Sequence, residues 1–215
     1  MSNPAPEYVA ARRVLLDALA DAGFTPGQNP GHWVAISRVT VDLMVVPHQA
    51  GTSKASARAA RLPPHDVHTA RITRGLEPAL LDNDRATIAA LEPNDERTFE
   101  LRIAGPAALL TAKAIKISER LDRNDTRPDR INEKDALDVF RILQAVDARE
   151  LARGFGKHLR DHHAAVVTSQ ALEMYRVDGS TPRGRFVDMA ANAAPNDPSV
   201  APAFVALVKE VLAEL

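Results

Sequence analysis

Apolar residues recur every three or four positions along residues 7–22, where Val14, Leu15 and Leu19 fall on one stripe. This spacing predicts an amphipathic helix. Gly23 follows directly, and glycine is a residue type that commonly ends a helix. The chain is therefore expected to begin with a helix of about four turns.

The next part of the chain has the shorter, β-branched runs that are typical of strands. Residues 32–36 and 38–47 predict a hairpin, whose V-T-V-D-L-M-V-V run is apolar enough to predict burial on both faces. Further short strands are predicted at residues 69–73, 86–91 and 97–103. Turn and loop composition is found at residues 24–31 and at residues 50–70, where a short helix is also expected.

From Pro106 onward the pattern is helical. Helices are predicted at residues 106–121, 133–147, 149–177, 182–193 and 199–214, and Pro106 suits the first position of its helix. The change near residue 105 divides the chain into an α/β part, residues 1–104, and a helical part, residues 105–215. The predicted fold class is α+β, with a small mixed sheet followed by a helical C-terminal region.

Composition excludes several classes of function. The 215 residues carry a net charge of −1, so no global field favours nucleic acid or membrane. The chain has no cysteine, which excludes disulfides, thiolate catalysis and Cys-ligated zinc. No apolar run approaches the roughly 20 residues of a membrane helix, and the N-terminus does not resemble a signal peptide. A cytoplasmic protein is expected.

Asp42 lies within the apolar V-T-V-D-L-M-V-V run. A carboxylate is costly to bury unless it is paired, hydrogen-bonded or bound to a metal. One interpretation is that Asp42 faces a cleft or a partner cation, and the apolar residues on both sides favour it. The alternative is an edge strand with Asp42 in solvent.

Three cations share one face of the predicted helix 106–121. Lys113, Lys116 and Arg120 stand at i, i+3 and i+7. Such a stripe suits phosphate oxygens. Alternatively, Lys113 reaches water along its own aliphatic stem and has no functional partner.

The following helix is predicted to begin with Lys134, Asp135 and Asp138. Acidic residues suit a helix N-terminus, whereas the dipole there disfavours the Lys134 ammonium. The carboxylates could simply neutralise the cationic stripe by ion pairing. Alternatively, the cations and acids together hold a nucleotide, with the cations on phosphate and the acids on a metal or a hydroxyl group. The candidate nucleotide-binding residues are Lys113, Lys116, Arg120, Lys134 and Asp138.

The segments P-A-A-L-L-T-A-K and K-D-A-L-D-V-F-R-I-L resemble the second half of the AbiEii-type (abortive infection) nucleotidyltransferase toxins. The resemblance covers roughly residues 8–147, and V-D-L-M-V-V resembles a strand of that family that carries a carboxylate. It implies that Asp42 supports a bound Mg²⁺ ion, that Lys113 contacts the triphosphate of a nucleoside triphosphate, and that Asp135 completes the active site. It also implies an RNA substrate, the acceptor end of tRNA.

The sequence departs from this family at its beginning. The family starts with a Gly-Gly or Gly-Ser turn followed by an Asp-x-Asp strand, and residues 1–30 contain neither pattern. Two-metal phosphoryl transfer depends on such carboxylates. Either a further segment precedes Met1, or the chain is a reduced member that binds a nucleotide or a partner without doing chemistry.

Three functions therefore compete. The first is an active nucleotidyltransferase toxin that modifies RNA. The second is a catalytically reduced relative that binds nucleotide or RNA. The third is a non-catalytic interaction protein, for instance a toxin–antitoxin component with an antitoxin protein as its partner.

Two weaker patterns remain. Residues 54–74 contain five cations against the single acid Asp66, and they form either an RNA-contacting surface or a solvated loop: Lys54, Arg58, Arg61, Arg71 and Arg74. Several histidines have spacings compatible with metal ligation, although a solvated helix face is favoured for the second group: His65 and His68, then His158, His162 and His163.

Overall fold

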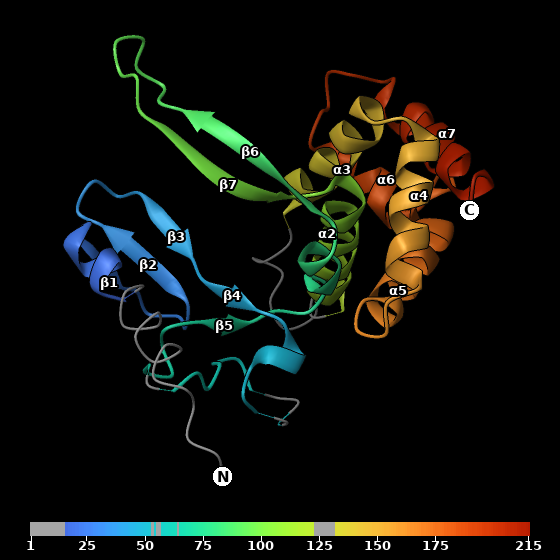
Figure 1. Cartoon of the computed structure of the whole chain (residues 1–215). Coiled ribbons are helices and arrows are strands. Elements are labelled where there is room, and N and C mark those ends of the chain that lie inside the picture. Colours follow the sequence, from blue (N-terminus) through green and yellow to red (C-terminus); the bar gives the residue numbers. More distant parts are fainter. Residues whose placement is uncertain (1–15, 53, 55–56, 64, 123–131) are drawn as a thin grey trace. The chain divides into compact units, whose positions relative to one another are not determined.

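A computed structural model describes residues 16–52, 54, 57–63, 65–122 and 132–215 (Figure 1). The chain forms two compact units, Met1–Arg74 and Gly75–Leu215. Strands occur in both units and the helices from residue 106 onward fill the second, so the predicted α+β class with a helical C-terminal region is confirmed. The sequence-based division near residue 105 falls inside the second unit, between its strands and its helices.

The described part of the first unit begins with a helix over residues 16–21, and the earlier part of the predicted helix lies outside the described residues. Gly23 ends it with a φ of +76°, a conformation that glycine adopts without a steric penalty. Strands β1 (Phe24–Pro26), β2 (His32–Ala35) and β3 (Thr40–Asp42) follow. They pair antiparallel in the order β1-β2-β3.

The predicted hairpin is β2 with β3 and is confirmed. The predicted turn over residues 24–31 is wrong for Phe24–Pro26, because this segment pairs with the other side of β2 and satisfies its backbone groups. After β3, the strand β4 (Met44–Val45) pairs in parallel with β5 (Arg71–Ile72), which lies within the predicted strand at residues 69–73.

The prediction that the V-T-V-D-L-M-V-V strand is buried on both faces is wrong. Thr40, Asp42 and Met44 are exposed, whereas Val41 and Leu43 are partly buried. The reason is that side chains alternate between the two faces of a strand, and among the described residues the small core of this unit packs against the face that carries Leu43 and Val45. That core contains Ala50, Ala60 and Ala70, with Leu43, Val45, Leu62 and Ile72 packed against it.

No helix occurs among the described residues from 50 to 70, so the short helix expected there is not found in that part of the segment. Backbone pairing takes its place: the Ala60 amide donates to the Ala70 carbonyl, and the Arg61 amide donates to the Ala50 carbonyl. A single turn of 3₁₀-helix, η1 (Pro47–Gln49), precedes the segment.

The second unit opens with η2 (Glu77–Leu80) and an antiparallel hairpin of β6 (Asn83–Ala89) and β7 (Thr98–Ala104). Helices follow, closely matching the predicted ranges except at one place. They are α2 (Pro106–Leu121), α3 (Glu133–Ala145), α4 (Ala148–Leu159), α5 (Ala165–Met174), α6 (Arg185–Asn192) and α7 (Val200–Ala213). No helix among the described residues is long and apolar enough to cross a membrane.

The exception is the single helix predicted at residues 149–177. The chain instead turns between α4 and α5, where the Asp161 carboxylate accepts hydrogen bonds from the His163 and Ala164 amides. These bonds stabilise the turn of residues 161–164 that separates the two helices. After α5 the chain continues as a π-helical segment, η4 (Tyr175–Gly179).

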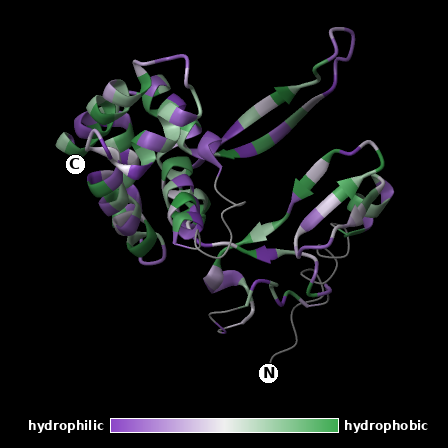
Figure 2. Ribbon diagram, turned by 180° about the vertical axis from the view of Figure 1, so that it is seen from behind, coloured by the Kyte–Doolittle hydropathy of each residue, from purple (hydrophilic) through white to green (hydrophobic). Residues whose placement is uncertain are grey.

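The core of the second unit lies between α2, α3 and the later helices. Leu110, Ala114 and Ile117 of α2 are almost fully buried, and Phe140 of α3 stacks on Phe204 of α7 with ring centroids 6.1 Å apart. Figure 2 shows that these helices carry hydrophobic residues on some faces and hydrophilic residues on others. Each fully buried large side chain contributes about 1.5–3 kcal/mol, which fixes the positions of α2 and α3.

Two side-chain hydrogen bonds connect helix α4 to the residues just before β6. The Lys157 ammonium donates to the Leu81 carbonyl, and His158 Nε2 lies 2.9 Å from the Asp82 carboxylate. His158 is 0% exposed, so the favoured prediction of a solvated histidine is wrong at this position. Its partner comes from 76 residues earlier in the chain, and local spacing could not reveal it.

Glycine at position 154 allows α4 to approach α2 closely. A Cβ atom there would stand 2.6 Å from the Cβ of Ala107. Gly156 lies two residues further along α4. A Cβ atom there would have only the end of the flexible Arg160 side chain nearby, at 3.7 Å. The first glycine is required by packing and the second is not.

We predict that His158 makes the fold sensitive to mild acid. Burial lowers the pKa of His158 below its ordinary value of 6.5, although the Asp82 hydrogen bond and charge oppose the shift. Below 6.5 the unfolded chain then binds a proton more readily than the folded chain, so the free energy of unfolding falls as the pH falls toward the folded pKa. Urea titrations between about pH 8 and about pH 5 measure this slope.

The matched variant is His158→Gln, whose amide retains a donor for Asp82 but does not titrate. Its free energy of unfolding should depend less steeply on pH than that of the wild type. Equal slopes in the two proteins would contradict this role of His158.

Candidate functional site

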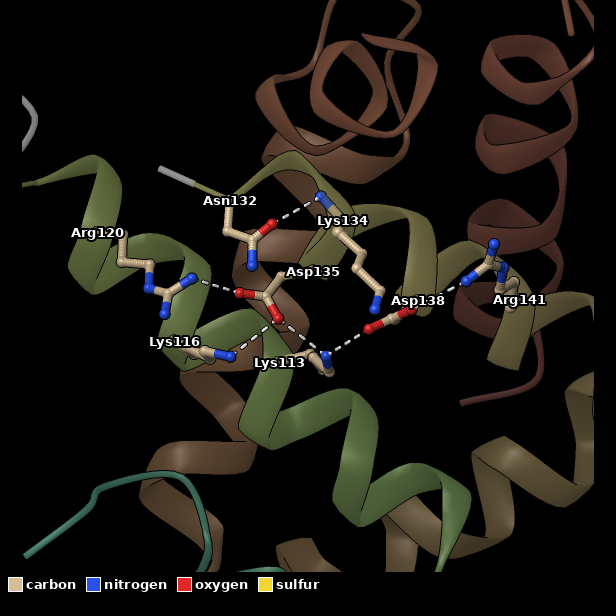
Figure 3. A network of polar contacts seen from close by, with 8 residues as sticks. All are labelled: Lys113, Lys116, Arg120, Asn132, Lys134, Asp135, Asp138 and Arg141. Atoms are coloured by element: carbon tan, nitrogen blue, oxygen red, sulfur yellow. Dashed lines mark hydrogen bonds and ion pairs between the residues drawn. The ribbon is translucent and has the colours of Figure 1, made fainter. Parts of the chain in front are cut away.

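The candidate site lies where α2 and α3 pack together (Figure 3). The buried stripe of α2 faces the core, and this orientation directs Lys113, Lys116 and Arg120 along the side of the helix that meets α3. Helix α3 begins at an N-cap, Asn132, whose side-chain oxygen accepts a hydrogen bond of 3.2 Å from the Lys134 amide. This cap fixes the first turn of α3, which carries Asp135.

Asp135 is the centre of the cluster. Its Oδ1 accepts hydrogen bonds of 2.9 Å from both Lys113 Nζ and Lys116 Nζ, and its Oδ2 accepts one of 2.5 Å from Arg120 Nη1. The side chain of Asp135 is only 4% exposed. The predicted helical face of three cations therefore converges on one buried carboxylate.

Asp138 extends the cluster by one helical turn. Lys113 Nζ donates to its Oδ2 at 2.8 Å, and Arg141 Nη1 donates to its Oδ1 at 3.3 Å. The ammonium of Lys113 thus bridges both carboxylates, and it does not extend into water without a partner. The alternative in which Lys113 merely snorkels is wrong, because two acids lie within hydrogen-bonding distance.

These contacts determine the protonation states. Burial opposes the charged form of Asp135, but the hydrogen bonds and charges of Lys113 and Lys116 outweigh burial and lower the pKa of the carboxyl. The hydrogen bond from Lys113 is the main cause of the lowered pKa of Asp138. Burial likewise opposes the charge of Lys113, yet its bonds to Asp138 and Asp135 raise its pKa. Both acids and the lysine are therefore charged at neutral pH.

The cluster carries more positive than negative charge. Five cations surround two carboxylates, which leaves three positive charges in excess among these residues: Lys113, Lys116, Arg120, Lys134 and Arg141, with Asp135 and Asp138. In the contacts among described residues, Lys113 uses two of its three N–H donors, and Lys116 one of three. The cluster can therefore donate further hydrogen bonds to an anion.

Lys134 has no role in capping through its side chain, because the Asn132 cap involves its backbone amide. Its ammonium charge is close enough to contribute to the lowered pKa of Asp138. Lys134 also lines a pocket beside the cluster, together with Arg141. Lys134, whose charge is disfavoured by the helix dipole, thus lies at the edge of a concave surface.

Asp42 belongs to the first unit, and its described contact is within that unit. Its Oδ1 lies 3.0 Å from His32 Nδ1, directly across the β2–β3 pair, and its side chain is 45% exposed. Strand β3 is at the edge of its sheet, which agrees with the alternative that placed Asp42 in solvent on an edge strand. The catalytic role of Asp42, and its convergence with Lys113 and Asp135, stay predictions.

The donor atoms around Asp42 do not match a magnesium site. Mg²⁺ prefers an octahedron of oxygen ligands, whereas the described neighbour of Asp42 is an imidazole. Among the described residues, no three His, Asp or Glu side chains are arranged to hold a metal ion. Mg²⁺ at Asp42 therefore stays a prediction, and none of the chemistry proposed below depends on it.

The cations of residues 54–74 are mostly on the surface. Lys54, Arg58, Arg61 and Arg74 are exposed, while Arg71 is half-buried with Nη2 at 3.4 Å from the sulfur of Met44. Their exposure is compatible with both interpretations of this segment, contact with RNA and a solvated loop.

Sequence reasoning missed two members of the cluster, Arg141 and Asn132. Arg141 stands at i+3 from Asp138, a spacing that brings opposite charges together on a helix. Asn132 precedes the first acidic turn of α3, which is a common arrangement at a helix start. Both signals are local and were available in the sequence.

The chain matches no known family model, no curated protein and no solved structure.

We predict that Asp135→Asn lowers the free energy of unfolding by about 1–3 kcal/mol, the cost of losing charged hydrogen bonds. The variant leaves three cations close together around a neutral amide, although each can turn partly toward water. Asp138→Asn is the matched control on the same helix, and it should cost less because Asp138 is more exposed and contacts fewer cations. Urea denaturation measures both, and the reverse order would contradict the central position of Asp135.

Proposed function

We propose that the α2–α3 cluster binds the triphosphate of a nucleoside triphosphate, and that the chain is a nucleotidyltransferase-like protein of the AbiEii toxin type. The observation that supports this most is the convergence of Lys113, Lys116 and Arg120 on Asp135, with excess positive charge and with N–H donors that the contacts among described residues leave unused. A triphosphate carries several oxygen acceptors, and cations held in fixed positions bind it with little loss of side-chain entropy.

In this proposal Asp135 positions the cations. Its two oxygens already accept three hydrogen bonds, and its side chain is nearly inaccessible. A role in which Asp135 itself binds a metal would require these bonds to break. The arrangement instead favours Asp135 as the residue that holds three phosphate-binding side chains in one geometry.

RNA, and tRNA in particular, is the proposed second substrate, supported by the motif resemblance and by the exposed cations of residues 54–74. Catalysis in this chain is proposed to be reduced, because residues 1–30 contain no Asp-x-Asp pair. The second candidate function is a non-catalytic interaction protein, such as a toxin–antitoxin component. It is favoured by the fact that each cation of the stripe already has a carboxylate partner.

We predict that Lys113→Met weakens nucleotide binding about tenfold to hundredfold, the loss expected when a charge-assisted contact of roughly 1.5–3 kcal/mol is removed. Titration calorimetry with each of the four ribonucleoside triphosphates measures the affinity. Lys209→Met is the matched control, because Lys209 is an exposed lysine of α7 outside the cluster. A melting curve for each variant establishes that it is folded at the titration temperature.

Equal affinities in the wild type and in Lys113→Met, or no binding to either, would remove the nucleotide proposal. Asp135 and Asp138 would then be interpreted as simple ion-pair partners, and the interaction protein would become the first candidate.

We further predict that this chain does not transfer nucleotide to RNA at a measurable rate. Incubation with labelled nucleoside triphosphates, Mg²⁺ and total tRNA should leave the RNA unlabelled, because residues 1–30 lack the Asp-x-Asp pair with which the family organises two metal ions. Strong labelling that disappears in Asp42→Ala would contradict the prediction and would identify Asp42 as part of an active centre.

A further inference from the structure

A shallow, open pocket of about 680 Å³ adjoins the cluster at the start of α3. Its lining combines cationic, apolar and oxygen-bearing side chains: Lys134 and Arg141, Leu137 and Ala193, Glu133 and Asn132. Ala193 follows the last residue of α6, so the pocket lies between the first turns of α3 and the end of α6. The side chain of Glu133 accepts a hydrogen bond of 3.2 Å from Asn192 Nδ2 across this junction.

Arg141 connects the pocket with the cluster. It lines the pocket, and its guanidinium donates to Asp138, whose other oxygen binds Lys113. Lys134 lines the same pocket, and its charge reaches Asp138. An anion bound to Lys113 would therefore be separated from the pocket-lining Arg141 by the side chain of Asp138. The shared residue Arg141 is compatible with one extended ligand that contacts both the cluster and the pocket.

We propose that this pocket receives the ribose and base of the nucleotide whose triphosphate the cluster binds. The inference rests on the proposed function and adds to it a place for the nucleoside. Leu137 and Ala193 supply an apolar surface for a base, and the oxygens of Glu133 and Asn132 are acceptors for ribose hydroxyls. The planar Arg141 side chain, 60% exposed, can stack on a base while it remains bonded to Asp138.

The composition of the lining also indicates what the pocket does not suit. Two of its six lining residues are apolar and only two are cationic, and Glu133 adds a negative charge. A bare polyphosphate would gain little from Leu137 and Ala193, and it would be repelled by Glu133. A ligand with an anionic end and a neutral, partly apolar body uses all of these groups.

The experiment compares two probes, inorganic tripolyphosphate and the four ribonucleoside triphosphates, by titration calorimetry on three proteins. These are the wild type, Ala193→Phe, which adds a ring to the pocket lining without changing its charge, and Ala213→Phe, which adds the same ring at an exposed position of α7. We expect the wild type to bind at least one nucleotide about tenfold or more tighter than tripolyphosphate. Ala193→Phe should reduce the affinity for that nucleotide to the affinity for tripolyphosphate, and it should leave the affinity for tripolyphosphate unchanged.

The outcomes separate this inference from the proposed function. If neither probe binds, both are overturned. If tripolyphosphate binds as tightly as every nucleotide, or if Ala193→Phe leaves the nucleotide preference intact, the cluster is a phosphate site and the pocket is not the nucleoside site. If Ala193→Phe weakens tripolyphosphate too, the smaller Ala193→Leu is tested in the same way. A lost preference with unchanged tripolyphosphate binding then supports the pocket, and any other result overturns it.

Discussion

The candidate site depends on the hydrogen bonds between the buried carboxylate of Asp135 and the three cations around it. A charge at this depth is costly, and the hydrogen bonds from Lys113, Lys116 and Arg120 offset the cost by satisfying both oxygens. Because the cations come from α2 and the acid from α3, the contact also fixes how the two helices face each other. The apolar packing around Phe140 and Leu110 holds the helices together, but the charge contact determines which polar groups meet.

The same contact is consistent with both interpretations of the cluster, a ligand-binding site and a purely structural group of ion pairs. Long basic side chains usually sample many rotamers, and holding them in place costs entropy whenever a ligand binds. Here that entropy is lost on folding, so an anion meets donors that are already ordered. Arg141 and Lys134 then extend the cluster along α3 toward the pocket beside α6. Whether an anion takes the remaining donors is a question of affinity, because the geometry is already in place.

Much of the second unit follows from local patterns. Helix α2 begins at Pro106 and ends at Leu121 as its spacing predicts, because its apolar stripe and its N-terminal proline are both properties of neighbouring residues. The cationic stripe and the acids of α3 were predicted too, but their convergence was left open, since it depends on the crossing of two helices. His158 and Asp82 could not be connected at all from the sequence, because they are 76 positions apart. The break after Leu159 was missed because it depends on a local turn, in which the Asp161 carboxylate accepts hydrogen bonds from the next backbone amides. In the first unit, burial of the strand that contains Asp42 was predicted wrongly, because among the described residues the core packs against the face of Leu43 and Val45.

The glycine at position 154 has a consequence for the order in which the molecule folds. Two glycines, Gly154 and Gly156, stand in the middle of α4, and each lowers the helix preference of an isolated segment by about 1 kcal/mol relative to alanine. A twelve-residue segment of this kind does not hold a helix by itself in water. The bare backbone at Gly154 becomes favourable only when Ala107 is present to pack against it. We therefore expect α2 to form first during folding, and α4 to become helical only as it packs against α2.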